Sequence, residues 1–137
     1  VGMFEERDAL PSEIQERIIN DPRIICTGFI NGGMEMYYSL MDVYVLASYR
    51  EGFPTGVLEA QSMEVPVITT RVTGCKDSIV DGVTGLFAEN DEKDIAEKIK
   101  EIRLGKKIDG TKGRIWVQEK FDSRIVWEEI DKLYQNG

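Results

Sequence analysis

Two short apolar runs constrain the fold of this 137-residue chain more than any other feature of its sequence. They read "DVYVLAS" at residues 42–48 and "VPVITT" at residues 65–70, and neither alternates strictly between apolar and polar positions. Strands that are apolar on both faces are typical of parallel sheets, because helices cover both sides of such sheets. The residues between the two runs suffice for the helical crossover that parallel strands require. We therefore expect an α/β fold.

The rest of the chain continues the alternation of strands and helices. Strands are predicted at residues 23–30, 42–48, 65–70 and, more weakly, 86–88. Helices are predicted at residues 10–20, 34–41, 54–63, 75–80, 92–104, 111–120 and 122–134. This order predicts a parallel sheet of about four strands with helices on both faces, which is a Rossmann-like half.

Composition and charge exclude several kinds of function. Asp and Glu outnumber Lys and Arg by 25 to 17, and the formal charge of −8 argues against nucleic acid as a partner. The chain has no histidine, so Ser-His-Asp and Cys-His nucleophiles and histidine-bound zinc are excluded. Cys26 and Cys75 form neither a disulfide framework nor a metal cluster, which fits a reducing, cytoplasmic setting. No apolar run reaches the roughly 18 residues of a membrane helix.

The stretch "EGFPTGVLEA", which begins at Glu51, is the candidate site. It follows a predicted strand, and ligands of open parallel sheets bind beyond the carboxyl ends of the strands. The helix that begins near Thr55 leaves its first amides without partners and carries partial positive charge there, which suits a diphosphate. Gly52 and Gly56 let a ligand approach the backbone. Glu51 and Glu59 can accept hydrogen bonds from sugar hydroxyls.

Both carboxylates also have a simpler explanation. A Glu before a helix interacts favourably with the helix dipole, and a Glu inside a helix is often part of a solvated face. The strand, the Gly-Phe-Pro turn and the helix start all occur together here, and this agreement favours a phosphate or sugar site.

The stretch "YYSLMDVYVLASYREGFPTGVLEAQSMEVPVITTRVTGCKDSIVDGVTGLF" resembles the donor-binding half of retaining glycosyltransferases of the GT-B fold, specifically family 4. Glu51 and Glu59 match the E-x7-E motif of that family. The likeness runs from about Val1 through "FDSRIVWEEIDKLY" near the end of the chain. Among these enzymes the chain most resembles those that build bacterial capsular or other surface polysaccharides.

The resemblance implies a hexosyltransferase whose substrate is a nucleotide-sugar, most often a UDP-sugar, with no metal ion and no other cofactor. Glu51 would be the catalytic residue and would bind hydroxyls of the donor sugar, while Glu59 would bind the two ribose hydroxyls. The implied donor-binding residues are Glu51, Gly52, Phe53, Pro54, Thr55, Gly56, Val57 and Glu59. The residues implied to receive the nucleotide base are Gly28, Phe29 and Ile30.

The resemblance also implies that residues 1–137 are part of a donor-binding domain, without the acceptor domain and first donor-domain strand of the family. That strand and its loop carry an Arg and a Lys for the diphosphate, and we expect the chain to be inactive without them. The acceptor would be a glycan or a lipid-linked sugar, bound through the missing domain. The parent enzyme would be cytoplasmic, or peripheral at the inner face of the plasma membrane.

Two other classes of function remain open from the sequence. One is a non-catalytic module that binds a nucleotide or a sugar, which the absence of the Arg and the Lys would fit. The other is an interaction domain without a ligand, similar to a receiver domain, but Asp21 and Asp42 are not placed to form the acidic cluster of a receiver.

Overall fold

The computed structural model of the chain describes residue 4 and residues 9–135. The chain divides into two compact units, Val1–Met34 and Glu35–Gly137, and each is described by itself. In the part of the chain that is described, no helix combines the length and the hydropathy needed to cross a membrane.

The first unit contains one helix, α1 (Ser12–Asn20), within its described residues. Pro11 precedes it, as expected for a residue with a fixed φ and no amide hydrogen. The strand predicted at residues 23–30 is wrong, because this segment forms no ladder in the described structure and only Gly28 takes part in a bridge. Ile25 is 82% exposed, and Gly28 has a φ of 69°, which interrupts an extended backbone.

The second unit is built on a parallel sheet. Its strands, in the order β1-β2-β3, are β1 (Tyr44–Leu46), β2 (Val67–Thr70) and β3 (Gly85–Ala88). The sheet confirms the predicted α/β class, but the described residues form three strands rather than about four. Of the four predicted strands, the one that is missing is the segment 23–30, which forms no ladder with another strand.

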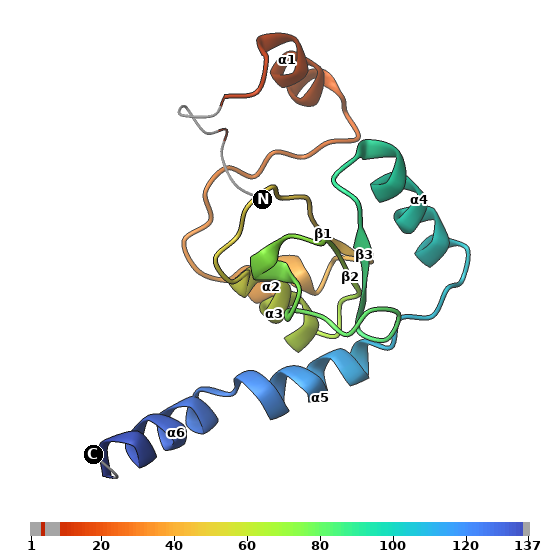
Figure 1. Cartoon of the computed structure of the whole chain (residues 1–137). Helices are drawn as coiled ribbons and strands as arrows, with labels where there is room; N and C mark the ends of the chain where they lie inside the picture. The colour runs from red at the N-terminus through yellow and green to blue at the C-terminus, as the bar shows by residue number, and fades with distance from the viewer. Residues whose placement is uncertain (1–3, 5–8, 136–137) are drawn as a thin grey trace. The chain divides into compact units, whose positions relative to one another are not determined.

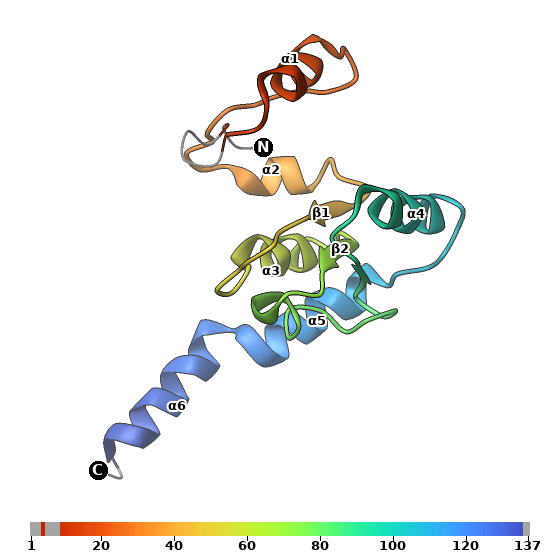
Figure 2. The ribbon, with the colours of Figure 1, turned by 45° about the horizontal axis from the view of Figure 1, so that its top comes forward.

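Helices cover both faces of this sheet. The helices that contact its strands are α3 (Thr55–Ser62) and α4 (Glu92–Arg103). Of the others, α2 (Met34–Tyr38) precedes β1, α5 (Gly110–Phe121) packs on α3, and α6 (Ser123–Gln135) follows α5. Figures 1 and 2 show α4 on one side of the strands and α3 on the other. Successive side chains of β2 point to opposite faces of the sheet, which explains this arrangement. Ile68 packs in a core with Ile95 and Ile102 of α4, whereas the buried Val67 points to the other face.

The segment after β2 differs from the prediction. Residues 75–80 do not form a helix; instead a single 3₁₀ turn, η1 (Thr73–Cys75), is followed by further turns. The bond from the Ser78 amide to the Cys75 carbonyl closes the next turn, and the Ser78 hydroxyl donates to the same carbonyl. This double use of one carbonyl favours tight turns over a regular α-helix.

Candidate functional site

The predicted site lies where the sequence placed it, in the connection from β1 to α3. Since β1 and β2 are parallel, residues 47–54 leave the carboxyl edge of the sheet and lead into the first turn of α3. Pro54 and Val57 are buried and anchor this connection, whereas Gly52, Phe53 and Thr55 are exposed. Figure 2 shows the connection as the loop that precedes α3.

The first amides of α3 are available to a ligand. Pro54 occupies the N-cap position and offers no side-chain hydrogen bond to the helix. The Val57 amide donates to the Pro54 carbonyl at 3.0 Å, while the amides of Thr55 and Gly56 have no acceptor in the described structure. Two free amides at the positive end of a helix dipole form a suitable place for an anion.

The backbone near Glu51 is held by β2. The Ser48 amide donates to the Thr70 hydroxyl at 3.2 Å, and the same hydroxyl donates to the Ser48 carbonyl at 2.6 Å. The Ser48 hydroxyl in turn donates to the Arg50 carbonyl at 3.1 Å. The Glu51 carboxylate itself makes no hydrogen bond or ion pair within the described residues. Its backbone is therefore fixed while its carboxylate remains free for a ligand.

A second support for this loop comes from Gly74 in η1. Gly74 is buried, and a Cβ atom placed there would strike the backbone carbonyls of Glu51 and Gly52. Only a residue without a side chain lets the two backbones approach so closely. The turn after β2 thus supports the turn after β1, and Gly74 belongs to the framework of the site.

Phe53 is fixed by aromatic contacts with α5. Its ring lies 5.3 Å from the ring of Phe121, and the ring of Trp116 lies 5.0 Å from Phe121 in an edge-on arrangement. Pairs at such distances are favourable beyond the area that they bury. The end of α5 therefore holds the tip of the candidate site.

The Glu59 carboxylate, unlike that of Glu51, has a protein partner. The Tyr38 hydroxyl donates to Glu59 Oε2 at 2.8 Å. Burial raises the pKa of Tyr38 well above its ordinary value, and the hydrogen bond to Glu59 raises it further. The phenol consequently keeps its proton throughout the physiological range and acts only as a donor to Glu59.

Tyr44 lies beside both carboxylates. Burial raises its pKa, and the negative charges of Glu59 and Glu51 add to that effect, which places both side chains in its neighbourhood. Its ring is 5.8 Å from that of Tyr38, and a Cβ atom on Gly56 would come within 2.6 Å of its hydroxyl oxygen. The Tyr44 side chain thus extends from β1 and packs against the first turn of α3.

The residues predicted to receive a base lie in the first unit, so their position relative to Glu51 and Glu59 is not described. Gly28 and Ile30 are half-buried there, and Phe29 is 72% exposed. The base-binding role of all three stays a prediction.

Sequence reasoning missed four residues that shape the site: Tyr38, Tyr44, Thr70 and Gly74. Tyr38 and Thr70 act through partners 21 and 22 residues away, and Tyr44 packs against Gly56 of another element, which local patterns do not show. Gly74 lies in a turn, where glycine is common, and only the structure shows that its buried position against another loop is the reason for its lack of a side chain.

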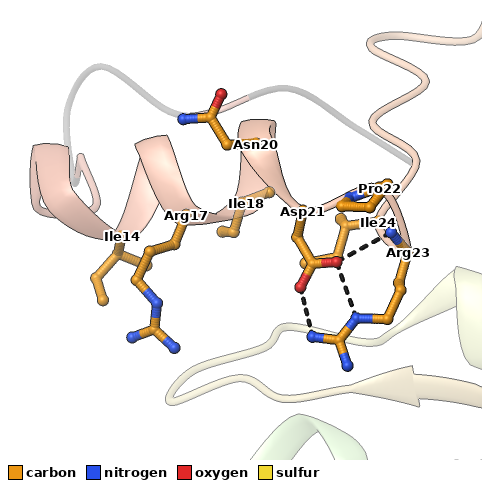
Figure 3. A pocket seen from close by; sticks show the side chains of 8 residues that line it. All are labelled: Ile14, Arg17, Ile18, Asn20, Asp21, Pro22, Arg23 and Ile24. Atoms are coloured by element: carbon orange, nitrogen blue, oxygen red, sulfur yellow. Dashed lines mark hydrogen bonds and ion pairs between the residues drawn. The ribbon is translucent and has the colours of Figure 1, made fainter.

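An open pocket of about 670 Å³ also occurs in the first unit, beside α1. Figure 3 shows its lining by Ile14, Ile18 and Ile24, with Asp21 and Arg23 at one end. Arg23 donates to Asp21 at 2.6 Å, and this pairing lowers the pKa of Asp21. Arg17 and Asn20 also line the pocket, and none of the site residues predicted from the sequence is among its lining residues.

No group of three or more metal-ligating side chains is close enough to hold a metal ion within the described residues. The expectation that no metal or cofactor takes part stays a prediction, because this observation does not test it. The free amides of α3 offer partial positive charge to an anion.

Comparison with known proteins identifies relatives along the whole chain. The family described as "Glycosyl transferases group 1" matches residues 1–103. The capsular polysaccharide biosynthesis glycosyltransferase CapM of Staphylococcus aureus is 36% identical over 138 residues. That alignment covers 98% of this chain and 36% of CapM, so the chain spans about a third of the length of this relative.

Solved structures agree with this relationship. Sucrose-phosphate synthase from Thermosynechococcus elongatus superposes with a TM-score of 0.81 at 28% identity, over 91% of this chain and 32% of that chain. HepE of Anabaena in complex with UDP superposes with a TM-score of 0.85 at 18% identity, over 99% of this chain and 40% of that chain, and shows the fold alone. These neighbours confirm the expected Rossmann-like half of a GT-B fold. The chain belongs to the group 1 glycosyltransferase family.

Proposed function

We propose that the chain is part of the donor-binding domain of a retaining glycosyltransferase. The parent enzyme transfers a sugar from a nucleotide-sugar, with UDP as the nucleotide, to a glycan or lipid-linked acceptor in the synthesis of a surface polysaccharide. Membership of the group 1 family supports transfer, and the likeness to CapM supports a capsular or similar product. The UDP complex of HepE, which has the same fold, supports the choice of nucleotide.

One observation carries this proposal more than any other. Two free amides of α3 lie between Glu51 and Glu59, at the carboxyl edge of a parallel sheet. A nucleotide-sugar has the matching order of groups, because its diphosphate lies between the donor sugar and the ribose. We assign the diphosphate to the amides of Thr55 and Gly56, the donor sugar to Glu51, and the ribose diol to Glu59.

The assignment gives each residue a defined task. The N-terminal end of α3 stabilises the negative charge that grows on the diphosphate as the sugar departs, an electrostatic contribution that is often the largest in such reactions. Glu51 accepts hydrogen bonds from sugar hydroxyls and orients the sugar for transfer. Gly52 and Phe53 line the sugar, while Val57 packs below the phosphate end of the helix.

Transfer is assigned to the parent enzyme and not to the 137 residues alone. The chain spans about a third of the length of CapM, and we assign acceptor binding to parts of the parent enzyme outside these residues. We propose that the chain binds the donor without transferring it, and that the parent works in the cytoplasm, at the inner face of the membrane that carries lipid-linked acceptors.

An NMR titration tests donor binding directly. UDP, GDP, ADP and their sugar conjugates are added to the chain and to its Glu59→Ala variant, with Glu119→Ala as a control because Glu119 is an exposed carboxylate on α5. We expect UDP and UDP-sugars to shift the amides of residues 53–59. Glu59→Ala should weaken UDP binding, so that these shifts are clearly smaller at matched ligand concentration, and Glu119→Ala should leave them unchanged.

Other outcomes contradict the proposal in different ways. Equal shifts with all three nucleotides would reject the choice of UDP. A well-folded chain that shows no shifts with any nucleotide would reject the donor site, and so would shifts that are equally large in Glu59→Ala. A non-catalytic module would give the expected binding, so transfer must be measured on the parent enzyme with a lipid-linked acceptor.

A further inference from the structure

The hydrogen bond between Tyr38 and Glu59 joins two segments that are 21 residues apart. Tyr38 ends α2, whereas Glu59 lies in the middle of α3. We infer that Tyr38 is a positioning residue, which orients the Glu59 carboxylate to accept two hydrogen bonds from a vicinal diol of the ligand. The inference rests on the proposed function, since it takes that diol to be the ribose of a nucleotide donor.

Tyr38 is itself held in one orientation. Its side chain is 4% exposed, and its ring lies 5.8 Å from the tilted ring of Tyr44. A buried aromatic ring packed against a second ring has few rotamers available, so its hydroxyl oxygen stays in a fixed place. The carboxylate that accepts from this hydroxyl is then restricted as well, although Glu59 is exposed.

The number of acceptor positions fits a ligand diol. An ionised carboxylate offers about four lone-pair positions, two on each oxygen. Tyr38 occupies one position on Oε2, so Oε1 and the rest of Oε2 face outward without a protein donor in the described structure. Two hydroxyls on neighbouring carbons can reach two oxygens of one carboxylate in a way that a single hydroxyl cannot.

Protonation keeps Tyr38 in this role. Burial and the bond to Glu59 both favour the neutral phenol, so the hydroxyl keeps its proton and donates a hydrogen bond to Glu59. A simpler explanation is that Tyr38 only fills the space between α2 and α3. Phenylalanine fills that space equally well and lacks the hydroxyl, so Tyr38→Phe separates the two explanations.

The test compares two ligands across a set of variants. Affinities for UDP and for 2′,3′-dideoxy-UDP are measured by calorimetry for the unmodified chain, Tyr38→Phe, Glu59→Ala and the double variant. Tyr37→Phe is the matched control, because Tyr37 is the neighbouring tyrosine and its hydroxyl makes no hydrogen bond in the described structure. Heteronuclear NMR spectra verify that each variant is folded.

The expected result is selective. Tyr38→Phe should weaken UDP binding about tenfold, as expected for loss of a hydrogen bond to a charged group, and should change dideoxy-UDP binding by less than about twofold. In the Glu59→Ala background, Tyr38→Phe should have no further effect on UDP. Tyr37→Phe should bind both ligands as the unmodified chain does.

Equal losses for both ligands would overturn the inference, because they would indicate a general structural role for Tyr38. Losses that persist in the Glu59→Ala background would overturn it too, since Tyr38 would then act independently of Glu59. If the unmodified chain binds UDP and dideoxy-UDP equally well, the diol assignment is wrong. If the unmodified chain binds neither, the proposed function itself fails.

Discussion

The two carboxylates of the candidate site are supported in opposite ways. Glu51 is fixed through its backbone, by Thr70 and Gly74, and its side chain has no protein partner in the described structure. Glu59 lies in a regular helix, and its side chain is bound by Tyr38. Under the proposed assignment, Glu59 is preorganised for the ribose that every donor shares, whereas Glu51 can adjust to different donor sugars.

The largest effect on this arrangement is expected at Gly74. In Gly74→Ala the new methyl group would strike the carbonyls of Glu51 and Gly52, and backbone atoms cannot move aside as a flexible side chain could. We expect a loss of about 3 kcal/mol in the free energy of unfolding, measured in urea, together with loss of UDP binding.

Gly52→Ala is the matched control for that variant. A Cβ atom on Gly52 would meet nothing within 4 Å, so the unfolding free energy should change by less than about 0.5 kcal/mol. The same methyl group would stand where we place the donor, and should weaken UDP-sugar binding. Equal stability of the two alanine variants would show that η1 does not support the Glu51 loop.

A smaller effect is expected when the Thr70 hydroxyl is removed. Thr70→Val keeps the shape of a buried strand residue but deprives the Ser48 amide and carbonyl of their partner. The unfolding free energy should fall by about 1–2 kcal/mol, and amide shifts should be confined to the Glu51 end of the site.

Thr69→Val provides the contrast on the neighbouring residue. The Thr69 hydroxyl is buried without a partner in the described structure, so its removal should leave stability unchanged or raise it. Were Thr70→Val as harmless as Thr69→Val, the proposed backbone support of Glu51 would lose its main interaction.

At the Glu59 end we expect a smaller effect on stability, and it should decrease only in alkaline solution. The folded-state pKa of Tyr38 is raised, so its contribution to stability is complete below the ordinary tyrosine pKa of about 10 and is lost as the pH rises through the raised value. The difference in unfolding free energy between the unmodified chain and Tyr38→Phe should therefore be constant from pH 7 to about pH 10 and shrink above it.

Tyr37→Phe should show no such pH dependence relative to the unmodified chain, apart from the small effect common to any tyrosine. A difference that stays constant far above pH 10 would indicate that the Tyr38 phenol ionises no later in the folded chain than in the unfolded one.

The smallest effect is expected from a chelator. A divalent cation bound to both carboxylates would abolish the distinction between them, and we propose that α3 makes such an ion unnecessary. UDP affinity measured with and without EDTA should agree within about twofold. A marked loss with EDTA, restored by magnesium or manganese, would replace the proposed role of the helix with that of a metal.

The sequence predicted the sheet and its helices well where apolar runs could find partners. "VPVITT" and "RIICTGFI" have similar compositions, yet the first contains a buried strand and the second lies exposed without a ladder. Strand propensity depends on the neighbours that a segment packs against, and a single run does not reveal those neighbours. The predicted extra strand failed for that reason.

The candidate site likewise has features that the local sequence predicts and features that depend on tertiary packing. The turn at residues 51–60 was found from local signals, because a helix start, its glycines and its carboxylates are close in sequence. The tyrosines that surround Glu59 and the threonine behind Glu51 belong to other elements, and their roles depend on how those elements pack. Local pattern nominated the candidate residues, and tertiary structure decides how rigidly each is held.

The aromatic contacts at the tip of the site give the chain an optical reporter of its own. Trp116 lies against Phe121, which lies against Phe53, so the indole is two rings away from the place where we put the donor. The other tryptophan, Trp127, is 64% exposed on α6, so its fluorescence is that of a solvent-exposed indole. In a Trp127→Phe background, the fluorescence of Trp116 would then report donor binding near Phe53 without any attached dye.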